Sequence, residues 1–168
     1  PSPADLAGCT APFLPWIIAG PAKLFVIYPE AQPYSGVEFE YGTEDCWTRV
    51  TDWFAQEHRI HLPWFDRPAD GWWAEAGPSP YVVAAPAYGF RVIPFAECGL
   101  ENLHVGDVIL MRVRARRTNH AAVYLGGGRI LHHLYGELSR VEQFEGPWQR
   151  MATHVCRHEQ LAALTSRC

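Results

Sequence analysis

The sequence has no long apolar run, no closely spaced cysteine pairs and no excess of positive charge. Prolines interrupt its apolar stretches well short of the roughly 18 residues that a membrane helix needs, so we expect no membrane insertion. A formal net charge of -4 and a pI near 6.1 give no electrostatic footprint for nucleic acid, and we expect no such partner. The short basic run over 112–117 is interpreted as the solvated end of a strand.

The five cysteines are odd in number and lie far apart in the sequence: Cys9, Cys46, Cys98, Cys156 and Cys168. This pattern disfavours both a disulfide framework and a structural zinc site. A single reactive thiol is the alternative that the spacing leaves open.

The length of 168 residues suits one domain with a core of its own, plus a short additional segment. Two apolar runs, Trp16–Ala19 and Leu24–Tyr28, predict the strands of a hairpin. The stretch Pro29–Gly36 has the composition of a linker, so we place a boundary near residue 31. Residues 31–168 are expected to fold as one unit.

Within that unit the pattern predicts an α+β fold, with an antiparallel sheet packed against one helix. Asp45 is a good N-cap, and the apolar spacing after it predicts a helix to about His58 that carries Cys46 in its first turn. Proline and glycine break up the middle of the chain, which predicts loops with a short helix near Tyr81–Ala85. Alternating runs predict strands over 108–113, 120–125, 129–134 and about 151–157.

Cys46 is the candidate nucleophile because a helix N-terminus favours the thiolate form of cysteine. A small buried apolar residue is the ordinary role of a cysteine, so a base is needed to decide. A hairpin loop of two or four residues puts His120 opposite or diagonal to His132 on one sheet face, while His133 points to the other face. One imidazole can then take the thiol proton, and the other can fix its tautomer. We predict Cys46 as nucleophile, His120 as base and His132 as its orienter.

Several segments resemble the NlpC family of cell-wall cysteine peptidases, in the same order as in that family. These are Phe39–Cys46, Gly106-Asp107, Asn119–Gly126 and Leu131–His133, with twelve positions between the two histidines. The resemblance implies a papain-like fold and cleavage of the amide between D-glutamate, through its side-chain carboxyl, and a diamino acid in peptidoglycan stem peptides. It implies no metal and no organic cofactor.

The continuation of the sequence resembles the branch of this family found in tail assembly proteins of lambda-like phages. It comprises Leu134–Arg140, Gly146-Pro147-Trp148 and Thr153–His158. This implies other phage tail-tip proteins as partners, and a location in the virion tail or, during assembly, in the host cytoplasm. Trp72, Trp73 and Tyr81 are candidate lid residues, with core packing as the alternative.

Three features depart from or extend the resemblance. Trp47-Thr48 follows Cys46 where Ser-Gly is usual, and Phe39 stands where many members carry a pocket tyrosine. Tyr41 or Tyr34 is the expected replacement for that hydroxyl. Ser2–Asp5 resembles the end of the zinc motif of a JAMM-type domain, so residues 1–30 are interpreted as the C-terminal remnant of such a domain that binds no zinc by itself.

Two other classes of function stay open at this point. The chain could be a tail-tip component whose peptidase fold is catalytically silent, or a module that binds the cell wall without hydrolysing it. An acyltransferase is less favoured because the related transferases usually carry the histidine before the cysteine.

Overall fold

The computed structural model describes the backbone of 16–19 and 24–27, and residues 34–165 apart from 65–66, 68–70, 72–73 and 75–77. Side chains are described from 34 to 163 with the same gaps. The chain divides into two units, 1–32 and 33–168. In the first, β1 (Trp16–Ala19) pairs antiparallel with β2 (Leu24–Ile27), as the apolar runs predict. Ser2–Asp5 lies outside the described residues, so the origin of residues 1–30 stays a prediction.

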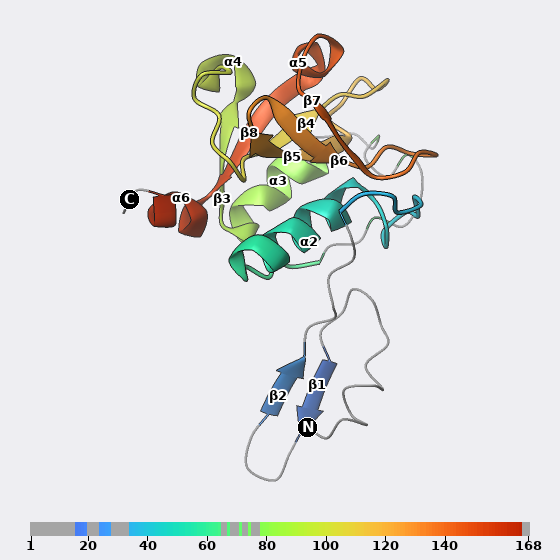
Figure 1. Cartoon of the computed structure of the whole chain (residues 1–168), viewed down its shortest axis with the longest axis vertical. Helices are drawn as coiled ribbons and strands as arrows, with labels where there is room; N and C mark the ends of the chain where they lie inside the picture. Colours follow the sequence, from blue (N-terminus) through green and yellow to red (C-terminus); the bar gives the residue numbers. More distant parts are fainter. Residues whose placement is uncertain are drawn as a thin grey trace. The chain divides into compact units, whose positions relative to one another are not determined.

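The second unit is built on a six-stranded antiparallel sheet in the order β3-β8-β4-β5-β6-β7 (Figure 1). Its strands are β3 (Phe90–Pro94), β4 (Val108–Met111), β5 (His120–Gly126), β6 (Arg129–His132), β7 (Arg140–Gln143) and β8 (Ala152–His158). Its α-helices are α2 (Cys46–His58), α3 (Pro80–Ala84), α4 (Phe95–Cys98), α5 (Pro147–Met151) and α6 (Glu159–Thr165), and a 3-10 turn, η2, spans Ala85–Tyr88. The α+β class is confirmed.

Both faces of the sheet are covered, which explains why β4 and β5 read as nearly continuous apolar runs. On one face α2 packs against alternate residues of the central strands, such as Ala121, Val123 and Leu131. On the other face Ile109 and Ala122 belong to a second cluster, which includes side chains from α4 and α5. Figure 1 shows α2 and α3 on one side of the sheet, with α4 and α5 at the other.

Two predicted strands end earlier than expected. β4 stops at Met111 because the Asn119 side chain bonds both backbone groups of Val113, which closes a loop in place of a ladder. β6 stops at His132, after which the chain turns, with the Glu137 N–H donating to the Leu134 carbonyl. Both early ends lie beside the candidate histidines.

None of the described helices is both long and apolar enough to cross a membrane.

Candidate active site

Cys46 is the first residue of α2, and Asp45 caps this helix as predicted. One Asp45 carboxylate oxygen accepts from the backbone N–H groups of Trp47 and Thr48, at 3.0 and 3.1 Å. These are two of the donors that a helix start leaves without partners inside the helix. The other oxygen accepts from the Gly42 N–H at 3.0 Å, so the same carboxylate ties the preceding turn to the helix. Cys46 is thereby held in a fixed position.

Arg67 balances the buried charge of Asp45. Its Nε lies 2.7 Å from Asp45 Oδ2, and its terminal nitrogen also donates to the Gly42 carbonyl and the Thr48 hydroxyl. The Arg67 and Asp45 side chains are 1% and 5% exposed. A buried carboxylate next to the nucleophile is therefore compensated by a buried guanidinium that no sequence motif indicates.

The Cys46 thiol is covered in the resting structure. Its Sγ lies 3.3 Å from the hydroxyl of Tyr81, and the Ala121 backbone N–H also donates to it. Burial, with a smaller contribution from Asp45, raises the pKa of this thiol to about 11 despite these hydrogen bonds and Arg67. The helix start therefore does not by itself produce a thiolate here, and Cys46 rests as a neutral thiol that needs a base.

His120 and His132 meet across the β5–β6 hairpin. Ala122 pairs with His132, so the register is even and His120 lies diagonal to His132 on one sheet face. His120 Nε2 lies 3.1 Å from His132 Nδ1, with the rings edge to face. Burial, and then the neighbouring histidines, lower the pKa of His120 well below its usual range, so this imidazole is neutral and can accept a proton.

His133 does not share the hydrogen bond between His120 and His132, although it lines the same pocket as Cys46 and His120. Its ring packs against Phe39, and its Nε2 bonds the Glu137 carbonyl at 3.0 Å. Burial, followed by the nearby Arg49 of α2, lowers its pKa to about 4. His133 thus belongs to the α2 side of the sheet, as strand alternation predicts.

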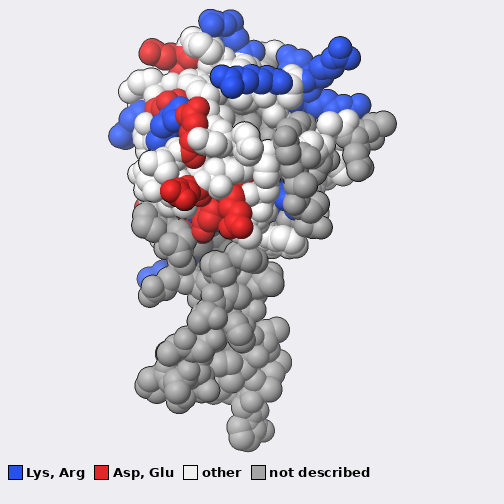
Figure 2. Space-filling view, turned by 90° about the vertical axis from the view of Figure 1, so that its right-hand side faces the viewer, with Lys and Arg blue, Asp and Glu red and all other residues white. Residues whose placement is uncertain are grey.

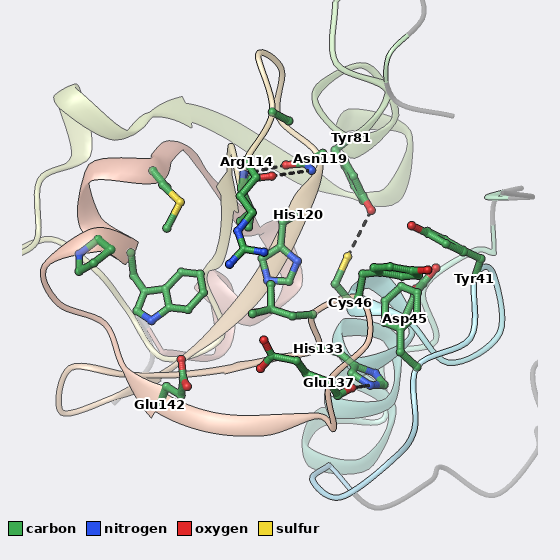
Figure 3. Close-up of a pocket in the computed structure, with 18 residues that line it drawn as sticks. Tyr41, Asp45, Cys46, Tyr81, Arg114, Asn119, His120, His133, Glu137 and Glu142 are labelled. Carbon is green, nitrogen blue, oxygen red and sulfur yellow. Dashed lines mark hydrogen bonds between the residues drawn. The ribbon is translucent and has the colours of Figure 1, made fainter. Parts of the chain in front are cut away.

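Cys46 and His120 line one cavity of about 700 Å³, together with Arg114 and Tyr41 (Figure 3). The figure shows the Arg114 side chain extending alongside His120. Arg114 has a left-handed backbone with φ of 50°, which is uncommon for a residue other than glycine. The basic run over 112–117, interpreted from the sequence as a plain strand end, therefore contributes one side chain to the pocket.

The tyrosine expectations are partly corrected. Tyr34 bonds Glu57 at 2.6 Å instead of serving the pocket, whereas Tyr41 does line it. The hydroxyl beside the thiol belongs to Tyr81. This residue is 4% exposed and packs in the core, which agrees with the core-packing alternative for it. Trp72 and Trp73 lie outside the described residues. The sequence singles out Tyr81 only as a candidate lid residue, because nothing in this proline-rich segment indicates that its hydroxyl contacts the Cys46 thiol.

Glu142 was also missed by sequence reasoning. Its Oε2 lies 3.2 Å from His132 Nε2, on the nitrogen that His120 leaves free. Among the described residues, no group of three or more histidine, cysteine or acidic side chains is arranged to hold a metal ion.

Comparison with known proteins identifies the family to which this chain belongs. The NlpC/P60 family model matches residues 36–157, well over half of the chain. The chain is 34% identical over 170 residues to tail tip assembly protein K of Escherichia phage N15, covering 96% of this chain and 65% of that protein. It is 33% identical over 147 residues to tail tip assembly protein K of Escherichia phage lambda, covering 86% and 68%. It thus spans about two thirds of the length of these relatives.

Among solved structures, a Staphylococcus aureus protein of the NLP/P60 family, described as similar to lipoprotein, aligns with a TM-score of 0.48 and 22% identity. That alignment covers 76% of this chain and 38% of the other. The sequence resemblance to the NlpC family is confirmed by the family match and by the two phage relatives. The chain belongs to the NlpC/P60 family, whose members are generally cysteine peptidases or amidases.

Proposed function

We propose that this chain is a cysteine endopeptidase that hydrolyses the amide between D-glutamate and a diamino acid in peptidoglycan stem peptides. The observation that carries the proposal is a thiol at a helix start sharing one pocket with an imidazole that a second imidazole orients. This is the set of parts that nucleophilic catalysis by cysteine requires.

In this mechanism His120 removes the Cys46 proton as the sulfur attacks the amide carbon. His120 Nε2 is engaged by His132, so Nδ1 is the nitrogen left to act as base. The imidazolium then protonates the leaving amine, a thioester forms, and water attacks the thioester to release the acid. The Cys46 backbone N–H and the Tyr81 hydroxyl are the proposed donors to the tetrahedral oxyanion, each contributing roughly 3 to 4 kcal/mol in comparable sites.

The position of Arg114 in the pocket supports the proposal of an acidic substrate. A D-glutamyl residue that is joined through its side-chain carboxyl keeps its α-carboxylate free, close to the scissile amide. Arg114 is exposed at the pocket and forms no ion pair with any described acidic residue. A guanidinium in that place can receive the carboxylate through two parallel hydrogen bonds.

The phage relatives support a role in the tail tip. We propose that the chain works in the virion tail beside other tail-tip proteins and opens the cell wall locally. The host cytoplasm during assembly is a second proposed location. What supports this role is the similarity of the chain to two phage tail tip assembly proteins.

The test is digestion of purified peptidoglycan, with the products identified by mass spectrometry. Wild-type protein should release fragments with new diamino acid amino groups, and Cys46→Ala should release none while its circular dichroism is unchanged. Near wild-type digestion by Cys46→Ala would refute the assignment.

A catalytically silent, wall-binding tail component is the second candidate. The observation that favours it is the covered state of Cys46, a residue that is 5% exposed. It predicts that wild type and Cys46→Ala sediment equally with cell walls and that neither releases fragments.

A further inference from the structure

The two histidines alone do not determine which way protons point along their hydrogen bond. A neutral imidazole has one N–H and one bare nitrogen, so the 3.1 Å contact between His120 Nε2 and His132 Nδ1 can run in either direction. In one direction His120 Nδ1 is bare and can act as a base. In the other direction Nδ1 carries the proton, and His120 cannot accept one from Cys46.

Glu142 removes this ambiguity because an ionised carboxylate only accepts hydrogen bonds. Its Oε2 lies 3.2 Å from His132 Nε2, which must therefore carry the proton. The neutral His132 then presents a bare Nδ1, to which His120 Nε2 must donate. His120 Nδ1 is left bare, as catalysis requires.

The charge states of these groups agree with this direction. Burial alone would raise the pKa of Glu142, but the hydrogen bond from Arg140, the contact with His132 and the charge of Arg140 lower it overall, so the carboxylate is ionised at neutral pH. Burial lowers the pKa of His132 more than Glu142 raises it, so His132 is neutral. With Glu142 ionised and His132 neutral, His132 donates through Nε2 and accepts through Nδ1.

We propose that Glu142 is a positioning residue, which acts through His132 to keep His120 in the tautomer that can deprotonate Cys46. This inference rests on the proposed peptidase function. Figure 3 shows Glu142 across the pocket from Cys46, so its role is indirect.

The fold builds this contact from three consecutive strands. Glu142 pairs with Ile130 and lies diagonal to His132, so His120 of β5, His132 of β6 and Glu142 of β7 share one sheet face. Arg140 lies opposite His132, and its Nε bonds the other Glu142 oxygen at 2.5 Å.

Glu137 and Trp148 complete the surroundings of the contact between His132 and Glu142. Glu137 forms an ion pair with Arg140, and the edge-to-face ring of Trp148 lies 4.8 Å from that of His132. Among the residues that the structure describes, the charged and titratable groups that face His132 are His120, Glu142, Arg140 and Glu137.

The kinetic test compares Glu142→Leu, which has no acceptor, with Glu142→Gln, which keeps one without the charge. Glu142→Leu should lower kcat about 10- to 100-fold, as loss of an outer partner of a functional histidine typically does, with KM unchanged. Glu142→Gln should recover part of the loss. Glu145→Gln is the matched control, since this exposed side chain is nearby and is not seen to bond any described group. A Glu142→Leu enzyme with wild-type kcat would overturn the proposal.

A second readout does not depend on turnover. Nitrogen-15 NMR of the histidine rings in Cys46→Ala protein reports which nitrogen carries the proton. The proposal expects both His120 and His132 to be protonated at Nε2, and expects His120 to shift partly to Nδ1 protonation in Glu142→Leu. Protonation of His120 at Nδ1 in the parent would overturn the inference even for an active enzyme. An inactive wild type with the expected tautomers would instead refute the proposed function alone.

Discussion

At the scale of single residues, the resting protonation state of Cys46 determines how the site begins its reaction. Both partners of the first step are neutral, because burial raises the pKa of the thiol and lowers that of His120. Proton transfer therefore accompanies attack, in contrast to enzymes that store a thiolate and an imidazolium side by side.

Alkylation of Cys46 by iodoacetamide should report this state directly. Below a pKa of about 11 the thiol keeps its proton, so the thiolate fraction, and with it the rate, should rise about tenfold for each pH unit between 6 and 9. The rate is measured by mass spectrometry of the peptide that contains Cys46. A rate that is already constant below pH 7 would show a stored thiolate and contradict the neutral resting pair.

The two adjacent histidines should respond differently to substitution. His132→Ala should lower kcat roughly 10- to 1,000-fold through a misoriented His120, while His132→Asn or Gln should keep measurable activity. His133→Ala removes the bond to the Glu137 carbonyl and should cost about 1 to 3 kcal/mol of stability with little change in kcat. Steady-state kinetics and thermal unfolding of the variants check this. Greater catalytic damage from His133→Ala would contradict the assigned roles.

At the scale of elements, the start of α2 depends on a residue far along the chain. Removing the Arg67 guanidinium leaves the Asp45 carboxylate buried without its counter-charge. Arg67→Ala should therefore destabilise the fold by about 3 to 5 kcal/mol. Urea unfolding measures this, with Arg91→Ala, an exposed arginine of β3, as control. Equal stability of the two variants would show that Arg67 is not needed at this helix start.

The loop between β4 and β5 should determine substrate affinity. Arg114→Gln should raise KM about 10- to 100-fold with little change in kcat, because a hydrogen bond between charged groups contributes roughly 1.5 to 3 kcal/mol. Arg116→Gln removes the same charge from the same loop at an exposed position outside the pocket lining, and should leave KM unchanged. Equal effects of the two variants would point to general attraction and not to a carboxylate site.

At the scale of the whole molecule, the parts that the sequence predicts are those with local signals. The cap at Asp45 and the alternation of residues in the β5–β6 hairpin are properties of short segments, so the start of α2 and the shared face of His120 and His132 are predicted correctly. The NlpC resemblance adds the order of the motifs and hence the family.

The parts that the sequence does not predict are those fixed by long-range contacts. β7 is a short edge strand with one apolar residue among four, so neither the strand nor its Glu142 gives a periodic signal. Tyr81 reaches the thiol from 35 positions away, out of a segment broken by proline. Arg67 reaches Asp45 from an irregular segment in the same way.

The covering of the Cys46 sulfur also affects the chemical durability of the protein. Peroxide oxidises the ionised form of cysteine, and oxidation beyond the sulfenic acid is in general irreversible. Without a substrate Cys46 is therefore a neutral thiol, which is the form that oxidants attack least. The three cysteines among the described residues, Cys46, Cys98 and Cys156, are all buried and free. For Cys46, the burial that slows the first step of the reaction also protects the nucleophile from oxidation.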